Sequence, residues 1–258
     1  MSTTVIEGEN KSIIAAEDHE LQAMIDAGVH LGHSKNKRHP AMEPYIWTVR
    51  GSTSIIDLTK TKELFQQALE FLKSVAAKGE LVLLIGTRPA ARDIISETAR
   101  SLGMPYASER WVGGTLTNFK VISKRVEMLI DLEKKRVEGE FEKYTKKERL
   151  GFEKEIERLK RDFDGLRVMN RLPAAVFITN VPHELTAVRE ALRMKIPIVA
   201  LTDTNANPDL ISFPVPSNDD AKSVIRYWLE RVQQAIQDGR NEGLKRQNEN
   251  SDSNHDLH

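Results

Sequence analysis

The sequence contains no cysteine, which excludes disulfides and thiolate zinc sites and makes a reducing cytoplasm the expected compartment. It also lacks an excess of either charge, because 38 basic residues balance 38 acidic ones. Any contact with nucleic acid must therefore come from a local basic patch. No apolar run is long enough to span a membrane, and the polar first twenty residues do not resemble a signal peptide. We expect a soluble cytoplasmic protein with no membrane partner.

Fingerprints of nucleotide binding and catalysis are missing as well. Neither G-x-x-x-x-G-K-[ST] nor G-x-G-x-x-G occurs, although glycine turns at Gly86 and at Gly113-Gly114 follow apparent strands. There is no G-x-S-x-G motif and no supported pair of catalytic carboxylates. The sequence thus predicts no enzyme and no cofactor. A phosphate- or nucleotide-using α/β enzyme remains the disfavoured alternative.

What the sequence does contain is an alternation of strands and helices. Apolar runs typical of buried strands lie at 80–86, 174–179, 196–202 and 211–216, and helical or turn-like sequence follows each run. A strand hairpin turned at Gly51 precedes them. The alternation predicts an α/β fold, in which a parallel sheet has helices on both faces.

One highly charged segment, residues 119–166, interrupts this alternation. It carries two apolar stripes, and Gly139 offers a break between them, after which Thr145 and Glu148 can form a capping box. The second stripe steps by four and three residues, as a heptad seam does: Phe152, Ile156, Leu159, Phe163 and Leu166. The segment predicts an inserted antiparallel helical hairpin of the coiled-coil type. One solvated helix on the core, or a free coiled-coil adaptor, is a weaker interpretation.

The predicted organisation has four parts. A flexible N-terminus covers 1–16, and an α/β RNA-binding domain covers 17–118 and 167–237. The helical hairpin insertion covers 119–166. A disordered tail is expected over 238–258, because the chain there has almost no apolar residues.

Basic residues gather in the loop "GHSKNKRHP" and at turns that follow strands. Local patches of this kind can grip the phosphates of RNA even when the whole chain is neutral. Trp111 could stack on a base, but anchoring of the glycine turn that follows it is favoured. The residues predicted to contact RNA are Lys35, Lys37, Arg38, His39, Arg88, Arg92 and Arg110.

Three residues form a candidate metal site that the sequence does not decide. His30 and His33 are three positions apart, and Asp203 follows a strand, so together they offer ligand types that zinc accepts. The histidine pair, however, lies at a helix end followed by glycine and a loop, which leaves its geometry unfixed. Histidines that cap a helix or bond a carbonyl are favoured, and no metal is assigned.

Four segments resemble the small-subunit ribosomal protein two family in its bacterial form. In order, between about Leu21 and Gly239, they are "AGVHLGHSKNKRHPAMEPYIW", "GSTSIIDLTKT", "RWVGGTLTNFK" and "RLPAAVFITNVPHELTAVREALRMKIPIVALTDTNANPDLISFPVPSNDDA". The resemblance implies a flavodoxin-like parallel sheet bearing a helical hairpin, no enzymatic activity, and binding of small-subunit ribosomal RNA. It also implies that the chain is a monomer within the subunit, in contact with small-subunit ribosomal protein one and other ribosomal proteins. Asn180 stands where members often carry aspartate, which weakens any metal site carried over from the family.

Overall fold

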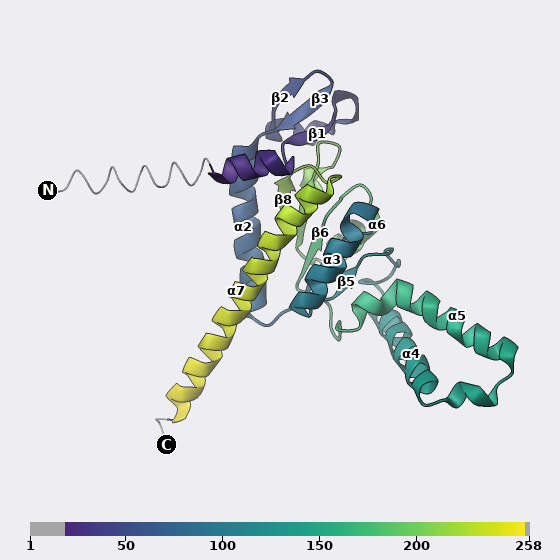
Figure 1. The fold of residues 1–258 in the computed structure, drawn as a ribbon. Helices are drawn as coiled ribbons and strands as arrows, with labels where there is room; N and C mark the ends of the chain where they lie inside the picture. Colours follow the sequence, from purple (N-terminus) through teal and green to yellow (C-terminus); the bar gives the residue numbers. More distant parts are fainter. Residues whose placement is uncertain (1–18, 256–258) are drawn as a thin grey trace.

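A five-stranded parallel sheet forms the centre of the structure (Figure 1). The computed structural model describes residues 19–255, with side chains as far as residue 246. The strands are β4 (Val82–Ile85), β5 (Tyr106–Ala107), β6 (Ala175–Ile178), β7 (Ile198–Thr202) and β8 (Phe213–Pro216). They stand in the order β5-β4-β6-β7-β8, which is the flavodoxin-like order. The predicted fold class is confirmed.

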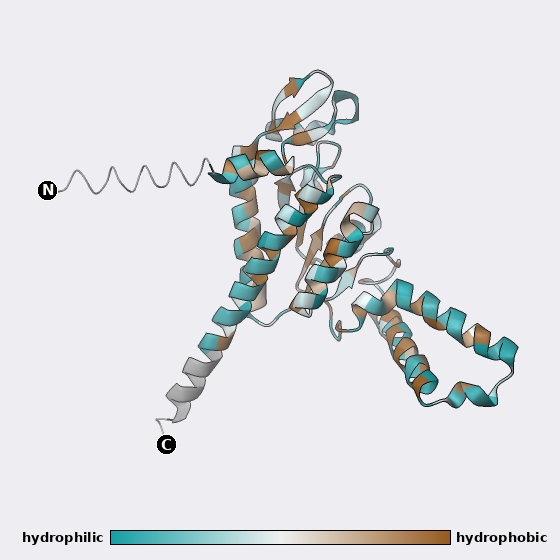
Figure 2. Ribbon diagram, in the orientation of Figure 1, coloured by the Kyte–Doolittle hydropathy of each residue, from teal (hydrophilic) through white to brown (hydrophobic). Residues whose placement is uncertain are grey.

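Helices flank both faces of this sheet or project from it: α2 (Leu58–Ala77), α3 (Pro89–Leu102), α4 (Phe119–Val137), α5 (Lys146–Phe163), α6 (Leu185–Arg193) and α7 (Lys222–His255). Neighbouring strand residues point to opposite faces, so each face has its own core. Leu84 and Phe177 belong to a core that they share with α2, α3 and α7, whereas Leu83 and Val176 belong to a second core that includes residues of α6 and of the hairpin helices α4 and α5. Figure 2 shows hydrophilic residues predominating along α5 and α7.

A small antiparallel sheet lies against one end of the large one. Its strands are β1 (Leu31–Ser34), β2 (Ile46–Arg50) and β3 (Thr53–Ile56), in the order β1-β3-β2. Gly51, at φ 63, turns the predicted β2–β3 hairpin. β1 was not predicted, and it lies partly within the segment that was expected to form the basic loop. The strand pairs with β3 in an irregular register, and Gly32 packs tightly against Thr204, so no apolar alternation marks it.

The segment between β5 and β6 consists mainly of α4 and α5, which project together from the sheet domain (Figure 1). Ile122, Val126 and Leu129 of α4 share a buried cluster with Ile156 and Leu159 of α5. Between the helices lie Gly139 at φ 74 and the short helix η3 (Glu140–Lys143). The predicted capping box of Thr145 and Glu148 is present.

Glu133 makes the predicted seam of α4 irregular, and it has a role of its own at the root of the hairpin. Its carboxylate lies 2.6 Å from Arg167 Nη1 and 2.9 Å from Lys160 Nζ. The hydrogen bond from Arg167, more than the one from Lys160, lowers the pKa of Glu133 to about 2. At this position of α4, ion pairs with Arg167 and Lys160 therefore replace an apolar contact.

The predicted disordered tail from residue 238 is wrong, because α7 continues to His255. A Cβ built at Gly239 or Gly243 would come closer than 3.0 Å to backbone atoms of α2, so the two helices pack with almost no space between them. Arg240 also donates a hydrogen bond to the Leu102 carbonyl. The contact is made by glycines of α7 and the backbone of α2, so counting apolar side chains in the sequence does not reveal it. The predicted flexible segment 1–16, and residues 256–258, lie outside the described residues.

Candidate nucleic-acid interface

The turn after β4, where this fold commonly places a ligand, is occupied by a carboxylate of the chain itself. Strand order reverses between β4 and β6, and ligands of open α/β sheets bind at such a point, beyond the carboxyl ends of the strands. Glu184, only 3% exposed, accepts hydrogen bonds there from the Thr87 amide at 2.9 Å and the Thr87 hydroxyl at 2.6 Å. The donors at the turn therefore have an internal acceptor.

The glycine turn in "RWVGGTLTNF" holds a second internal carboxylate, that of Glu190 on α6. One oxygen accepts from Trp111 Nε1 at 3.0 Å and the Gly114 amide at 2.8 Å. The other accepts from the Leu116 amide at 3.0 Å and from the amide and hydroxyl of Thr117, both at 3.1 Å. Gly114, at φ 92, allows the backbone to fold around the acceptor.

This cradle keeps Glu190 charged. Glu190 is only 8% exposed, and burial alone would raise the pKa of its carboxyl group. The hydrogen bonds from Trp111 and from the Gly114, Thr117 and Leu116 amides outweigh burial, so the pKa is lowered. The loop does hold an anion, but the anion is Glu190. The interpretation that Trp111 anchors the turn is confirmed.

Three of the predicted RNA-binding arginines are engaged with acids of the chain. Arg110 is 60% exposed, and Arg92 also donates to the Thr87 carbonyl at 2.9 Å. The pairs are Arg88 with Asp220, Arg92 with Glu109 at 3.3 Å, and Arg110 with Asp162 at 4.0 Å. Arg88 and Arg92 lie at the start of α3, whereas Arg110 faces the root of the hairpin. Arg88 lies near the start of the loop 34–39, because its partner Asp220 also pairs with His33 at 3.4 Å.

Within the loop 34–39 only the two lysines are free to meet an outside anion. Lys35 and Lys37 are exposed, and neither makes an ion pair with any part of the chain that the structure describes. Arg38 pairs with Glu43 at 2.5 Å, and the Nδ1 atom of His39 accepts from the Ala41 amide. Backbone hydrogen bonds from Lys35 to Ser52 and from His39 to Thr204, each 2.8 Å, fix the shape of the loop.

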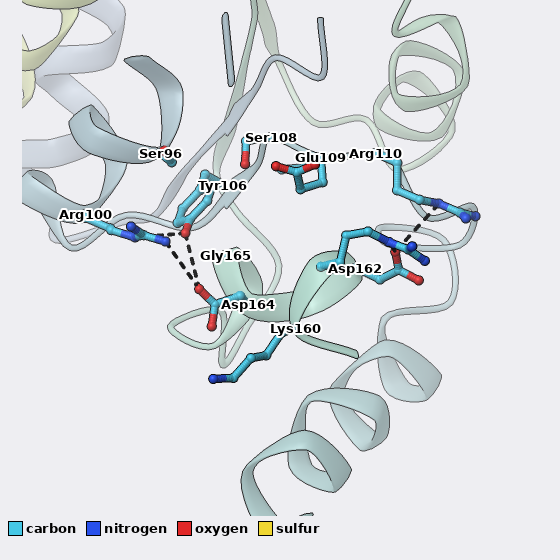
Figure 3. A pocket seen from close by; sticks show the side chains of 12 residues that line it. Ser96, Arg100, Tyr106, Ser108, Glu109, Arg110, Lys160, Asp162, Asp164 and Gly165 are labelled. Atoms are coloured by element: carbon cyan, nitrogen blue, oxygen red, sulfur yellow. Dashed lines mark hydrogen bonds and ion pairs between the residues drawn. The ribbon is translucent and has the colours of Figure 1, made fainter. Parts of the chain in front are cut away.

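A polar cavity of about 460 Å³ separates the sheet domain from the hairpin root (Figure 3). Figure 3 shows Arg100, Tyr106 and Asp164 joined on one side of it and Arg110 directed at Asp162 on the other. A Cβ at Gly165 would overlap Tyr106, so the root packs tightly on β5. Acids accompany the cations around the cavity, which gives it little preference for an anion.

His33 joins the small sheet to the carboxyl edge of the large one. Its Nδ1 atom lies 3.0 Å from Asp203 and its Nε2 atom 3.4 Å from Asp220. The hydrogen bond with Asp203 raises the pKa of His33 despite partial burial. His30 lies apart, in an apolar groove, where burial lowers its pKa. Across residues 19–246, no group of three or more His, Asp or Glu side chains is placed to hold a metal.

Asp219 lies beside His33, Asp203 and Asp220, and the sequence did not predict it as a site residue. The signal was available, because Asp219 and Asp220 follow the end of β8 much as Asp203 follows the end of β7. Asp219 is 1% exposed, and neither carboxylate oxygen has a hydrogen-bond partner among the described residues. Burial, reinforced by the charges of Asp203 and Asp220, raises the pKa of Asp219 to about 8, against the opposing charges of His33 and of Arg88, whose Nη1 atom lies 3.8 Å from Oδ1 of Asp219. The folded protein therefore holds a proton here that the unfolded chain releases near pH 4.

We expect stability to fall as pH rises from 6 to 9, and Asp219→Asn to reduce that fall. A group with a raised folded-state pKa contributes stability that is fully present below its unfolded-state pKa and is lost as pH rises from that value through the folded-state pKa, and this applies to Asp219 and to His33. The wild-type Tm should drop by roughly 5 °C more than that of the variant, at about 2–4 °C per kcal/mol. Thermal melts at both pH values measure this. Equal drops would contradict the assignment.

The chain matches one known protein family over most of its length. Residues 24–239 match the family described as ribosomal protein S2. The chain belongs to the ribosomal protein S2 family. A small ribosomal subunit protein uS2 of Sorangium cellulosum is 43% identical over 219 residues, covering 85% of this chain and 79% of the relative. One from a Roseiflexus species is 43% identical over 221 residues, covering 86% and 84%.

Membership in the ribosomal protein S2 family confirms the predicted resemblance. It makes the chain a structural ribosomal protein and not an enzyme, with the ribosome in the cytoplasm as its location. The internal carboxylates Glu184 and Glu190 agree with this, because they fill the two turns at which a nucleotide phosphate was considered. Among the described residues, no helix is long and apolar enough to cross a membrane.

Proposed function

We propose that this ribosomal protein S2 family member helps to build the small ribosomal subunit by binding its RNA and neighbouring ribosomal proteins. The observation that carries the proposal is the filling of both glycine turns by Glu184 and Glu190. Because these two carboxylates occupy the turns, the hydrogen-bond donors there stabilise the fold and do not bind a ligand. Exposed side chains elsewhere on the surface would then make the contacts with RNA.

The RNA contact is proposed to include the loop 34–39 and the turn arginines. Lys35 and Lys37 are its strongest members, because both are exposed in a loop of fixed shape and lack internal partners among the described residues. Each phosphate that they neutralise releases counterions, so binding through them should depend on salt. The other proposed members are Arg38, Arg88, Arg92 and Arg110, whose pairs with acids would have to be exchanged for phosphate, and His39, whose Nδ1 atom accepts from the Ala41 amide.

The double variant Lys35→Ala/Lys37→Ala should leave small subunits during a moderate-salt wash that retains the wild type. Two phosphate contacts fewer should lower the salt dependence of log K by about 2 units. The Tm should stay within a few degrees, because both side chains are exposed. Lys78→Ala/Lys245→Ala changes charge equally at exposed positions elsewhere and serves as the control. If both variants are retained like the wild type, this loop does not bind the RNA.

We also propose that small-subunit ribosomal protein one docks at an apolar groove beside β2. Trp47 on this edge strand is 74% exposed, which is unusual for the largest apolar side chain. It borders a groove of about 280 Å³ whose walls include Leu21, Ile25, Ile55 and Leu58. Burial of an exposed tryptophan is a common source of interface energy.

Replacing Trp47 with Ala should release ribosomal protein one from purified small subunits while the variant chain itself remains bound. The loss should be large, at least tenfold in occupancy, because interface tryptophans often contribute 2 kcal/mol or more. Protein composition of subunits by mass spectrometry measures it. Val137→Ala, at an exposed apolar position on the hairpin, is the control. Full occupancy by ribosomal protein one in the Trp47 variant would rule out the groove.

A further inference from the structure

The first two turns of α4 form an unopposed basic surface. Lys120, Lys124 and Arg125 are all exposed, and no acidic residue occurs in the stretch "FKVISKRV" that contains them. None of the three makes an ion pair with another described residue, and Arg125 reaches only the sulfur of Met128, at 4.0 Å. Three clustered cations without an ion pair among the described residues are notable in a chain whose formal net charge is +0, and the first acid after them is the exposed Glu127.

Elsewhere along the hairpin, cations are mostly neutralised by acids of the hairpin itself. Examples are Lys135 with Asp131 at 2.7 Å, Arg136 with Glu153 at 3.4 Å, Arg158 with Glu155 at 2.6 Å and Lys160 with Glu133 at 2.9 Å. At the start of α5, Lys146, Lys147 and Arg149 also lack an ion pair among the described residues, but Glu148 lies among them, whereas the first two turns of α4 contain no acid.

The arrangement is unfavourable for an isolated helix. Cations near a helix N-terminus oppose the positive end of the macrodipole, and the first turn of α4 has no acid to compensate. Lys120 and Lys124 are four residues apart, a spacing at which like charges on a helix repel each other. A polyanion bound along this face would relieve both effects at once.

We propose that this face, which we name the α4 basic face (Lys120, Lys124 and Arg125), docks on the phosphate backbone of ribosomal RNA. The proposal rests on the proposed ribosomal function and assigns one of its surfaces. Four helical residues advance about 6 Å, which is comparable to the spacing of successive phosphates on a strand. Exposed Val121 and Met128 lie on the same helix turns and offer apolar contact to ribose.

The structure also fixes where the α4 basic face points. Ile122, Val126 and Leu129 bury the opposite side of α4 against α5 and the sheet domain. Glu190 holds Leu116 and Thr117 by their amides, only a few residues before α4 begins. The cations are therefore presented outward from a rigid root, as docking on a preformed RNA surface requires.

The test uses small subunits depleted of this protein, rebound with the full-length chain over a series of salt concentrations. The variant Lys120→Gln/Lys124→Gln/Arg125→Gln should bind at least tenfold more weakly than the wild type at moderate salt. Its salt slope should be smaller by about 2–3 units. The control, Lys146→Gln/Lys147→Gln/Arg149→Gln, makes the same charge change on the other arm, at exposed residues that have no ion pair in the described chain. It should lose less than threefold.

A second arm distinguishes RNA from an acidic protein. Because the chain has no cysteine, Lys124→Cys provides a single attachment point for a tethered hydroxyl-radical source. Cleavage of ribosomal RNA strands next to this position is expected, and cleavage or crosslinking of protein alone would overturn the proposal. Equal losses in the two triple variants, or none in the α4 variant, would overturn it as well. Failure of the wild type to rebind would instead overturn the proposed function.

Discussion

Glu190→Ala is expected to lower the free energy of unfolding by about 3–5 kcal/mol, the range for removing one partner of a buried charged network. The variant leaves three backbone amides, the Trp111 indole and the Thr117 hydroxyl without their acceptor. Each buried donor left unsatisfied costs about 1–3 kcal/mol, although water that enters the loop will recover part of this. Urea unfolding followed by circular dichroism measures the change.

Two further variants show whether the carboxylate itself is responsible. Glu190→Gln keeps the shape of the side chain but places an NH₂ group where one carboxylate oxygen accepted hydrogen bonds. Its loss of unfolding free energy should be roughly half that of Glu190→Ala. Arg189→Ala, at the exposed neighbouring position, should change stability by less than about 0.5 kcal/mol. Hydrogen exchange should also quicken at residues 111–118 in the Glu190 variants. Unchanged exchange and a loss no greater than that of Arg189→Ala would contradict the anchoring role.

In the hairpin, Ile156→Ala or Leu159→Ala should each lower stability by about 2–5 kcal/mol, the cost of truncating a large buried side chain. Both residues are buried between the arms. Glu157→Ala, on the exposed side of the same helix, should cost only about 0.3–0.5 kcal/mol. Helical circular dichroism during thermal unfolding compares the three variants. Similar losses in all three would show that charge, and not the apolar seam, holds the arms together.

The elements of the fold were predictable wherever a periodic apolar pattern continues for several residues. The central strands are buried on both faces, so β4 and β6 appear as unbroken apolar runs. The strand order needed the family resemblance, because periodicity does not specify which strands are neighbours. β1 was missed since it pairs irregularly over four residues, and the end of α7 since glycines, not apolar side chains, make its contact.

The candidate site was only partly predictable, because its main contacts join residues distant in sequence. Glu190 bonds a turn some 75 residues earlier, and Glu184 bonds Thr87 across 97 positions. In the sequence Glu184, at the start of α6, and Glu190, within it, look like ordinary solvated acids. The basic loop was recognisable from composition, but the pairing of Arg38 with Glu43 was not. Charge clusters can be read from a sequence, whereas their partners depend on the fold.

Sedimentation of this chain through a sucrose gradient tests the central claim most directly. A cell lysate is separated under conditions that dissociate the two ribosomal subunits, and each fraction is probed for the chain. Membership in the small subunit predicts that the protein sediments with the small-subunit RNA and is depleted from the large-subunit peak. Recovery of nearly all of it at the top of the gradient, among free proteins, would contradict the account.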